Sequence, residues 1–190
     1  MRIIAGKFRR RQLRPVRSVD IRPTSDRLRE TLFNVLTAGN PHALEGSVWL
    51  DLFAGTGAVG IEALSRGAAM VHFVDSAKPA AELIRQNLQS LTITEGFQIL
   101  QHESAQAISQ LARQQIKPDY IFLDPPYQLR EAYQTTLEHL GSLSERALVI
   151  VEHEKRFDPG ETLGDLQRIR KLQQGDAGLS FYRRVTDRKA

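Results

Sequence analysis

One segment near residue 50 constrains the fold more than any other part of the chain. Residues 48–52 form an apolar run that predicts a buried strand, and it leads into the glycine-rich stretch Gly55-Thr56-Gly57-Ala58-Val59-Gly60. Helical spacing follows over residues 59–66, and a second apolar strand over residues 70–75 ends at Asp75. A strand, a glycine turn and a helix in this order are typical of an α/β unit that binds a nucleoside.

The alternation of strands and helices continues along the chain. The pattern predicts further helices and strands, which are helices over 78–91, 105–115 and 131–140 and strands over 97–100, 120–124 and 147–151. Residues 166–172 and 179–185 are two more strand candidates, joined by a short connection rich in Gly and Asp that is typical of an antiparallel hairpin. The sequence therefore predicts an α/β fold whose sheet is mostly parallel, with an antiparallel hairpin at its C-terminal end.

The first 40 residues differ from the rest in charge and in pattern. Residues 2–17 alternate loosely and favour a small β-hairpin or meander. A helix is expected behind the N-cap candidates Thr24, Ser25 and Asp26, as far as about Ala38. Residues 1–30 contain ten Lys or Arg and three Asp or Glu, whereas residues 31–150 contain seven and twelve. The net charge of +4 thus hides a basic head on an acidic body. We expect a basic extension, residues 1–40, and a main domain, residues 41–190.

Composition excludes several chemistries and leaves one question about the head open. The chain has no cysteine, which excludes disulfides, thiolate metal sites and a cysteine nucleophile, and its histidines lack the spacing of metal ligands. No apolar run is long enough to span a membrane and the N-terminus lacks a signal-peptide core, so we expect a cytoplasmic protein. The clustered cations of the head favour phosphate binding, and on charge alone a solvated or disordered tail is an equal alternative.

The glycine turn and its acidic neighbours predict the cofactor. Gly55 permits a tight turn, Gly57 allows a ligand to approach the backbone, and Gly60 allows close helix packing. Asp75 can accept hydrogen bonds from both ribose hydroxyls, and Asp51 would repel a pyrophosphate but suits a cation. This favours S-adenosylmethionine, which carries an ammonium group, over NAD. A glycine turn that only packs a helix is the alternative. The expected cofactor site also includes further residues of the same loops, namely Phe53, Ala54, Thr56 and Ser76.

The motif Asp124-Pro125-Pro126-Tyr127 follows the strand expected over residues 120–124. Two prolines end a strand in a stiff, extended turn because they cannot donate backbone hydrogen bonds. The Asp124 carboxylate and the Pro125 carbonyl can then accept hydrogen bonds from one exocyclic amine and orient its nitrogen toward a methyl sulfonium. Tyr127 offers a ring on which a flipped base can stack. An ordinary strand-ending turn is the alternative interpretation.

Together these residues resemble the class I S-adenosylmethionine-dependent methyltransferases that modify exocyclic or amide nitrogens. That class has a Rossmann-like, seven-stranded sheet whose last strands form a hairpin, as expected here. The same tetrapeptide pattern serves adenine N6, guanine N2 and, in an Asn-Pro-Pro-Tyr form, protein glutamine. The segments Arg2–Leu13 and Arg22–Leu36 look like the RsmD family of bacterial 16S rRNA guanine-N2 methyltransferases, and Val151-Glu152-His153 also matches. The resemblance implies methylation of guanine 966 of 16S rRNA, free or in an assembling small subunit, by an enzyme that we expect to be monomeric.

The resemblance also implies which residues contact RNA and adenine. Many class I enzymes place an Asp on the adenine amine after the third parallel strand, and this chain has Ser104 and Ala105 near that position. Ser104, a backbone carbonyl or Glu103 could make the contact. The expected substrate residues come from the head and from the fifth strand, namely Lys7, Arg9, Arg10, Arg11, Arg22, Thr24, Glu152 and His153. For Arg22 and Thr24 the alternative is helix capping, and for Glu152 and His153 it is a structural role.

Three rival functions share part of this pattern. A DNA adenine-N6 methyltransferase would use the same motifs, but it usually carries a sizeable target-recognition segment for which 190 residues leave little room. A catalytically silent RNA-binding module would not need Asp124. An NAD-dependent oxidoreductase is disfavoured by Asp51 and by the lack of a hydride-transfer constellation.

Overall fold

The structure, a computed structural model, describes residues 1–15, 25–125, 136–137 and 139–185. Helices whose bounds fall within these residues are α1 (Asp26–Leu36), α2 (Ala58–Ser65), α3 (Lys78–Ser90), α4 (Ser104–Arg113) and the 3₁₀ helix η1 (Gly141–Ser144). Eight strands are β1 (Val48–Leu52), β2 (Met70–Val74), β3 (Phe97–Leu100), β4 (Tyr120–Leu123), β5 (Leu148–Glu154), β6 (Thr162–Leu163), β7 (Leu166–Gln174) and β8 (Ala177–Arg184). The helix expected over residues 131–140 falls mostly outside the described residues.

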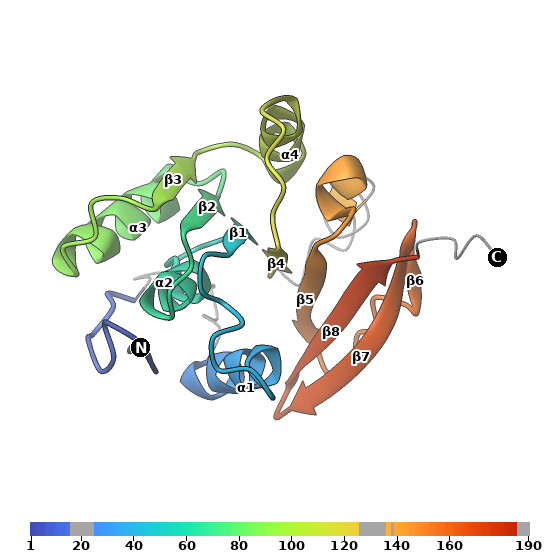
Figure 1. The fold of residues 1–190 in the computed structure, drawn as a ribbon, viewed down its shortest axis with the longest axis horizontal. Coiled ribbons are helices and arrows are strands. Elements are labelled where there is room, and N and C mark those ends of the chain that lie inside the picture. Colours follow the sequence, from blue (N-terminus) through green and yellow to red (C-terminus); the bar gives the residue numbers. More distant parts are fainter. Residues whose placement is uncertain (16–24, 126–135, 138, 186–190) are drawn as a thin grey trace.

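All eight strands form one sheet in the order β3-β2-β1-β4-β5-β8-β7-β6 (Figure 1). Strands β1 to β5 run parallel, whereas β8 pairs antiparallel with β5, β7 with β8, and β6 with β7. The predicted Rossmann-like fold with its C-terminal hairpin is confirmed. The eighth strand, β6, was not expected from the sequence, because two residues paired with Leu166 and Gln167 are too short to show a strand pattern.

The two faces of the sheet have separate hydrophobic cores, because successive residues of a strand point to opposite faces. Trp49 and Phe73 pack against α1, α2 and α3 on one face. Leu50 and Leu52 pack against α4 on the other. Burial on both faces explains why the central strand β1 is apolar almost throughout, with Asp51 as the exception at its carboxyl end.

The N-terminal head is anchored to the α/β body. Residues 1–15, here called the head loop, form an isolated antiparallel bridge between Arg2 and Gln12. Backbone hydrogen bonds from the Ile3 amide to the Arg11 carbonyl and from the Leu13 amide to the Met1 carbonyl support this short pairing, which is what remains of the expected hairpin or meander. Ile3 and Leu13 are buried in the same core as the residues of α2. The head loop therefore packs as part of the fold and is not a disordered tail, while its basic side chains are exposed to solvent. The division at residue 40 stays a prediction about roles.

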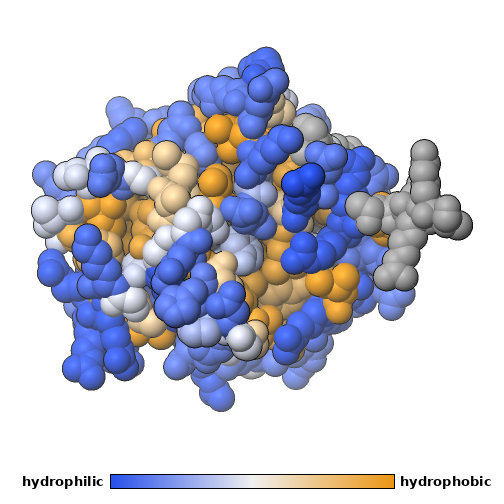
Figure 2. All heavy atoms as spheres, in the orientation of Figure 1, coloured by the Kyte–Doolittle hydropathy of each residue, from blue (hydrophilic) through white to orange (hydrophobic). Residues whose placement is uncertain are grey.

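Hydrophilic residues surround the scattered hydrophobic patches of the face drawn in Figure 2, and they project at the lower left, where Figure 1 places the head loop. Among the described residues, no helix is long and apolar enough to cross a membrane.

Candidate functional site

The glycine turn joins the carboxyl end of β1 to the start of α2. Gly57 caps α2 with a φ of 74°, and its amide donates to the Ala54 carbonyl at 2.7 Å. Phe53 also has a positive φ, 59°, which is uncommon for a residue with a side chain and marks a tightly constrained turn. A Cβ at Gly60 would lie 2.3 Å from Cε1 of Phe73, so only glycine lets α2 pack this closely on β2.

Asp51 is a buried carboxylate at the floor of this turn. It is 1% exposed, and its Oδ2 accepts a hydrogen bond from the Gly60 amide at 2.9 Å. Burial raises the pKa of Asp51 to about 8, the charges of Asp124 and Asp75 add to the rise, and the Gly60 bond opposes it. A cation bound beside Asp51 would relieve this unfavourable burial of charge, so the turn favours a positively charged ligand group.

Asp75 follows β2 and holds the turn from the other side. One carboxylate oxygen accepts from the Gly55 amide at 2.9 Å, and the other accepts from the Ala77 amide, also at 2.9 Å. A carboxylate has about four acceptor positions, so two backbone bonds leave capacity for hydroxyl donors. Ser76 beside it is exposed. The ribose contact expected for Asp75 stays a prediction that this geometry allows.

The start of α4 holds the residues expected near the adenine. Ser104 is the first residue of α4, with Ala105 next to it. The Ser104 hydroxyl lies 2.8 Å from the hydroxyl of Thr136, which is 1% exposed. Thr136 lies in a part of the chain that the sequence did not connect with the site. A hydroxyl has one donor and two acceptor positions, so the Ser104 oxygen can still accept from an adenine amine, and that contact stays a prediction.

Sheet order brings Asp124 to the glycine turn. β4 lies beside β1 with Leu123 opposite Leu52, so Asp124 follows at the level where the turn begins. The Asp124 amide lies 3.5 Å from the Leu52 carbonyl, and its carboxylate is close enough to affect the pKa of Asp51. Asp124 is half-buried and Pro125 is buried. Two members of this motif, Pro126 and Tyr127, lie outside the described residues.

The fifth strand contributes Glu152 and His153, both almost fully buried. The two ring nitrogens of His153 lie 2.9 Å from the Glu154 carbonyl and 2.9 Å from the Ser180 hydroxyl. Burial lowers the pKa of His153, and a Cβ at Gly178 would lie 2.5 Å from its Cε1. Of the two roles expected for His153, this geometry favours the structural one, because the ring is enclosed between β5 and β8.

The basic residues expected to contact substrate lie on the head loop. Lys7, Arg9, Arg10 and Arg11 are exposed. The Lys7 ammonium lies 5.4 Å from the centre of the Phe8 ring, and Nη2 of Arg11 donates to the Ser90 carbonyl at 3.0 Å. Arg22 and Thr24 fall outside the described residues. Within the part of the chain that the structure describes, no group of side chains could hold a metal ion.

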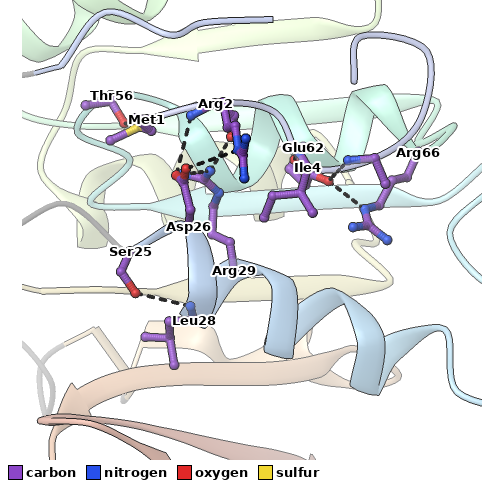
Figure 3. A network of polar contacts seen from close by, with 11 residues as sticks. Met1, Arg2, Ile4, Ser25, Asp26, Leu28, Arg29, Thr56, Glu62 and Arg66 are labelled. Atoms are coloured by element: carbon purple, nitrogen blue, oxygen red, sulfur yellow. Dashed lines mark hydrogen bonds and ion pairs between the residues drawn. The ribbon is translucent and has the colours of Figure 1, made fainter. Parts of the chain in front are cut away.

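Sequence reasoning missed the residues that hold the head loop. Glu62 of α2 is fully buried and accepts from the amides of Ile4, at 2.8 Å, and Ala5, at 3.0 Å, and from Nε of Arg66 at 2.7 Å (Figure 3). One residue could have been noticed, because Glu62 is the single charge in the apolar helix Ala58–Ser65. Its partners Ile4 and Ala5 could not have been inferred, because they lie 58 and 57 residues away in the sequence.

Arg29 of α1 is also fully buried near the start of the chain. Its Nη2 donates to the Asp26 carboxylate at 2.8 Å and to the Arg2 carbonyl at 2.5 Å (Figure 3). Burial lowers the pKa of Arg29, and the charges of Asp26, Glu62 and Glu152 oppose that shift. This cation therefore balances carboxylates that come from α1, α2 and β5.

Comparison with known proteins identifies relatives along most of the chain. The family model described as "Conserved hypothetical protein 95" matches residues 1–183. The protein named ribosomal RNA small subunit methyltransferase D of Haemophilus influenzae is 40% identical over 82% of this chain and 79% of its own. Its namesake from Escherichia coli K12 is 36% identical over 81% and 75%.

Solved structures share the fold. The yhhF protein of Escherichia coli is 31% identical, covers 97% of each chain and has a TM-score of 0.77. The more distant SMU.776, solved in complex with SAH, has 18% identity and a TM-score of 0.64 over 86% of this chain and 50% of its own, which shows the common fold alone.

Proposed function

Because the chain belongs to the RsmD family of S-adenosylmethionine-dependent methyltransferases, we propose that it methylates N2 of a guanine in 16S ribosomal RNA. The names of the relatives support ribosomal RNA as the substrate, and the resemblance of the head segments implies that the target is guanine 966. We further propose that the enzyme is a cytoplasmic monomer and that it acts on 16S rRNA or on an assembling small subunit.

The observation that carries the proposal is the position of Asp124 beside the glycine turn. The carboxylate expected to hold the target amine follows β4, and the turn expected to hold the methyl donor follows the neighbouring β1. The two segments are far apart in sequence, and the parallel pairing of β1 with β4 brings them to the same edge of the sheet. Donor and acceptor can therefore meet at this edge.

The residues at this edge fit the methyl donor. The buried Asp51, with its pKa raised to about 8, suits the ammonium end of S-adenosylmethionine. Asp75 has acceptor capacity left for ribose hydroxyls, and the backbone of Phe53–Gly57 forms the wall between them. When bound, this cofactor supplies an electrophilic methyl group. Ser76, Ser104 and Ala105 complete the proposed site.

The chain's own contribution to the reaction is to orient the amine. The Asp124 carboxylate and the Pro125 carbonyl accept hydrogen bonds from the exocyclic nitrogen, which fixes its geometry and stabilises the positive charge that develops on it. A strong base is not needed, since the methylated guanine nitrogen loses its extra proton readily. This agrees with the enclosed position of His153. Stacking on Tyr127 remains part of the proposal.

The head loop supplies the proposed grip on RNA. The four cations expected to contact substrate, Lys7 and Arg9 to Arg11, are exposed on a loop that is fixed to α2 and α3. Phosphate contacts from such residues position a nucleic acid without reading its sequence. Arg22, Thr24 and Glu152 stay proposed as substrate contacts.

The test is the identity of the methylated nucleoside. Purified enzyme, labelled S-adenosylmethionine and small subunits from a strain lacking the modification are incubated together, and the RNA is digested to nucleosides. Recovery of N2-methylguanosine supports the proposal. Recovery of N6-methyladenosine, or transfer to duplex DNA instead of rRNA, would refute the base or the substrate assigned here.

A further inference from the structure

Asn87 is a buried amide that joins two functional segments of the chain. It lies in the last turn of α3 and is 0% exposed. Its Oδ1 accepts from the Arg14 amide at 2.8 Å, while Nδ2 donates to the Thr56 carbonyl at 2.9 Å and to the Arg14 carbonyl at 3.3 Å. All three bonds leave the helix, and they occupy both hydrogens of the amide nitrogen.

The two segments that Asn87 joins have different proposed tasks. Thr56 stands between Gly55 and Gly57 in the turn proposed to hold the methyl donor. Arg14 stands at the described end of the head loop, three residues after Arg11. Because the amide is enclosed, water cannot replace a bond that is broken, so a shift of either segment leaves a polar group unpaired.

Further hydrogen bonds hold the head loop against α3, the helix that contains Asn87. Nη2 of Arg11 and Nη1 of Arg14 reach the Ser90 carbonyl and Oε1 of Gln86, both on α3. In the first half of the loop, the Ser65 carbonyl accepts from the Lys7 amide at 2.7 Å. The loop is thus fixed to α2 by its first half and to α3 by Arg11 and Arg14.

We propose that Asn87 is a positioning residue through which RNA binding at the head loop and donor binding at the glycine turn favour each other. The inference rests on the proposed function and adds to it a coupling between the two ligands. RNA that holds the head loop on α3 keeps Asn87 in place to fix the Thr56 carbonyl, and a donor that orders the turn fixes Arg14 through the same amide. The coupling is reciprocal by thermodynamic necessity.

The measured quantity is the ratio of two dissociation constants. SAH binding to the full chain is titrated by calorimetry with and without a 16S rRNA transcript. For the wild type we expect the transcript to tighten SAH binding by about fivefold or more, within the usual range of allosteric coupling. In Asn87→Ala the ratio is expected to fall to nearly one, although each ligand still binds. A merely structural role would weaken SAH binding equally with and without RNA and leave the ratio unchanged.

A second pair of variants tests the same bond without touching the buried side chain. Arg14→Pro removes the amide that donates to Oδ1 of Asn87, whereas Arg14→Ala keeps that amide and removes the same side chain. We expect the ratio to fall in Arg14→Pro and to persist in Arg14→Ala. This pair decides the matter if Asn87→Ala fails to fold in a thermal scan.

The outcomes separate the inference from the proposed function. A wild-type ratio of one, or a ratio that survives both Asn87→Ala and Arg14→Pro, overturns the coupling while rRNA methylation stands. Failure of the wild type to methylate small subunits overturns the proposed function itself.

Discussion

The raised pKa of Asp51 makes cofactor affinity depend on pH. If the cofactor's ammonium binds only the ionised carboxylate, the apparent Kd equals the intrinsic Kd divided by the ionised fraction. With a pKa of about 8, the ionised fraction of Asp51 increases almost tenfold when the pH is raised from 6 to 7, from roughly one hundredth to roughly one eleventh. The Kd for SAH should therefore fall about tenfold between pH 6 and pH 7.

Asp51→Asn is the matched control for this measurement. Asparagine can still accept the hydrogen bond from the Gly60 amide, but it has no charge to titrate. The cofactor's own ammonium has a pKa near 8, so it stays protonated over this range and contributes equally to both proteins. Calorimetric titrations at several pH values should give a steep dependence for the wild type and a flat one for the variant. Equal slopes in the two proteins would refute the role assigned to Asp51.

Three further predictions concern the head loop. Glu62→Ala leaves the Ile4 and Ala5 amides and Arg66 without their acceptor, so the free energy of unfolding should fall by about 3 kcal/mol. The exposed control Glu82→Ala should lower it by less than about 0.5 kcal/mol. Equal losses would contradict the role of Glu62 in holding the head loop. Gly6→Ala and Gly39→Ala both place a side chain at a φ near +80°, but only the Cβ added at position 6 would lie 1.8 Å from the Ser65 carbonyl oxygen. Gly6→Ala alone should therefore weaken RNA binding in a filter assay. An equal loss of binding in both variants would contradict the packing of the head loop against α2. Replacing Arg9, Arg10 and Arg11 with Ala should lower the salt slope of RNA binding by up to about 3 while SAH binding is kept, and an unchanged slope would place the RNA elsewhere.

Local patterns were sufficient to predict most of the fold. Ser25, one of three N-cap candidates, caps α1, and its hydroxyl accepts from the Leu28 amide at 3.1 Å. A cap can be predicted because it depends on neighbours in sequence. The central strands were visible because burial on both faces makes them continuously apolar. The short β6 was not, since its pairing with β7 depends on a turn rather than on apolar residues.

The site was predictable to the extent that it lies at strand ends. Asp51, Asp75 and Asp124 each stand at the carboxyl end of a parallel strand, and parallel strands bring such ends together. The supporting residues were not predictable in the same way. Asn87 and Thr136 are polar residues whose meaning comes from partners 31 or more residues away, and nothing in their local sequence names those partners.

The central claim is that Asp124 acts on the target amine beside a separately built cofactor turn. Single-turnover methyl transfer by Asp124→Ala, measured with SAH binding on the same preparation, tests it most directly. The account predicts a rate lower by about 10²-fold or more, as for the loss of one oriented hydrogen-bonding group, with SAH binding retained. Transfer within a few-fold of the wild-type rate would contradict it.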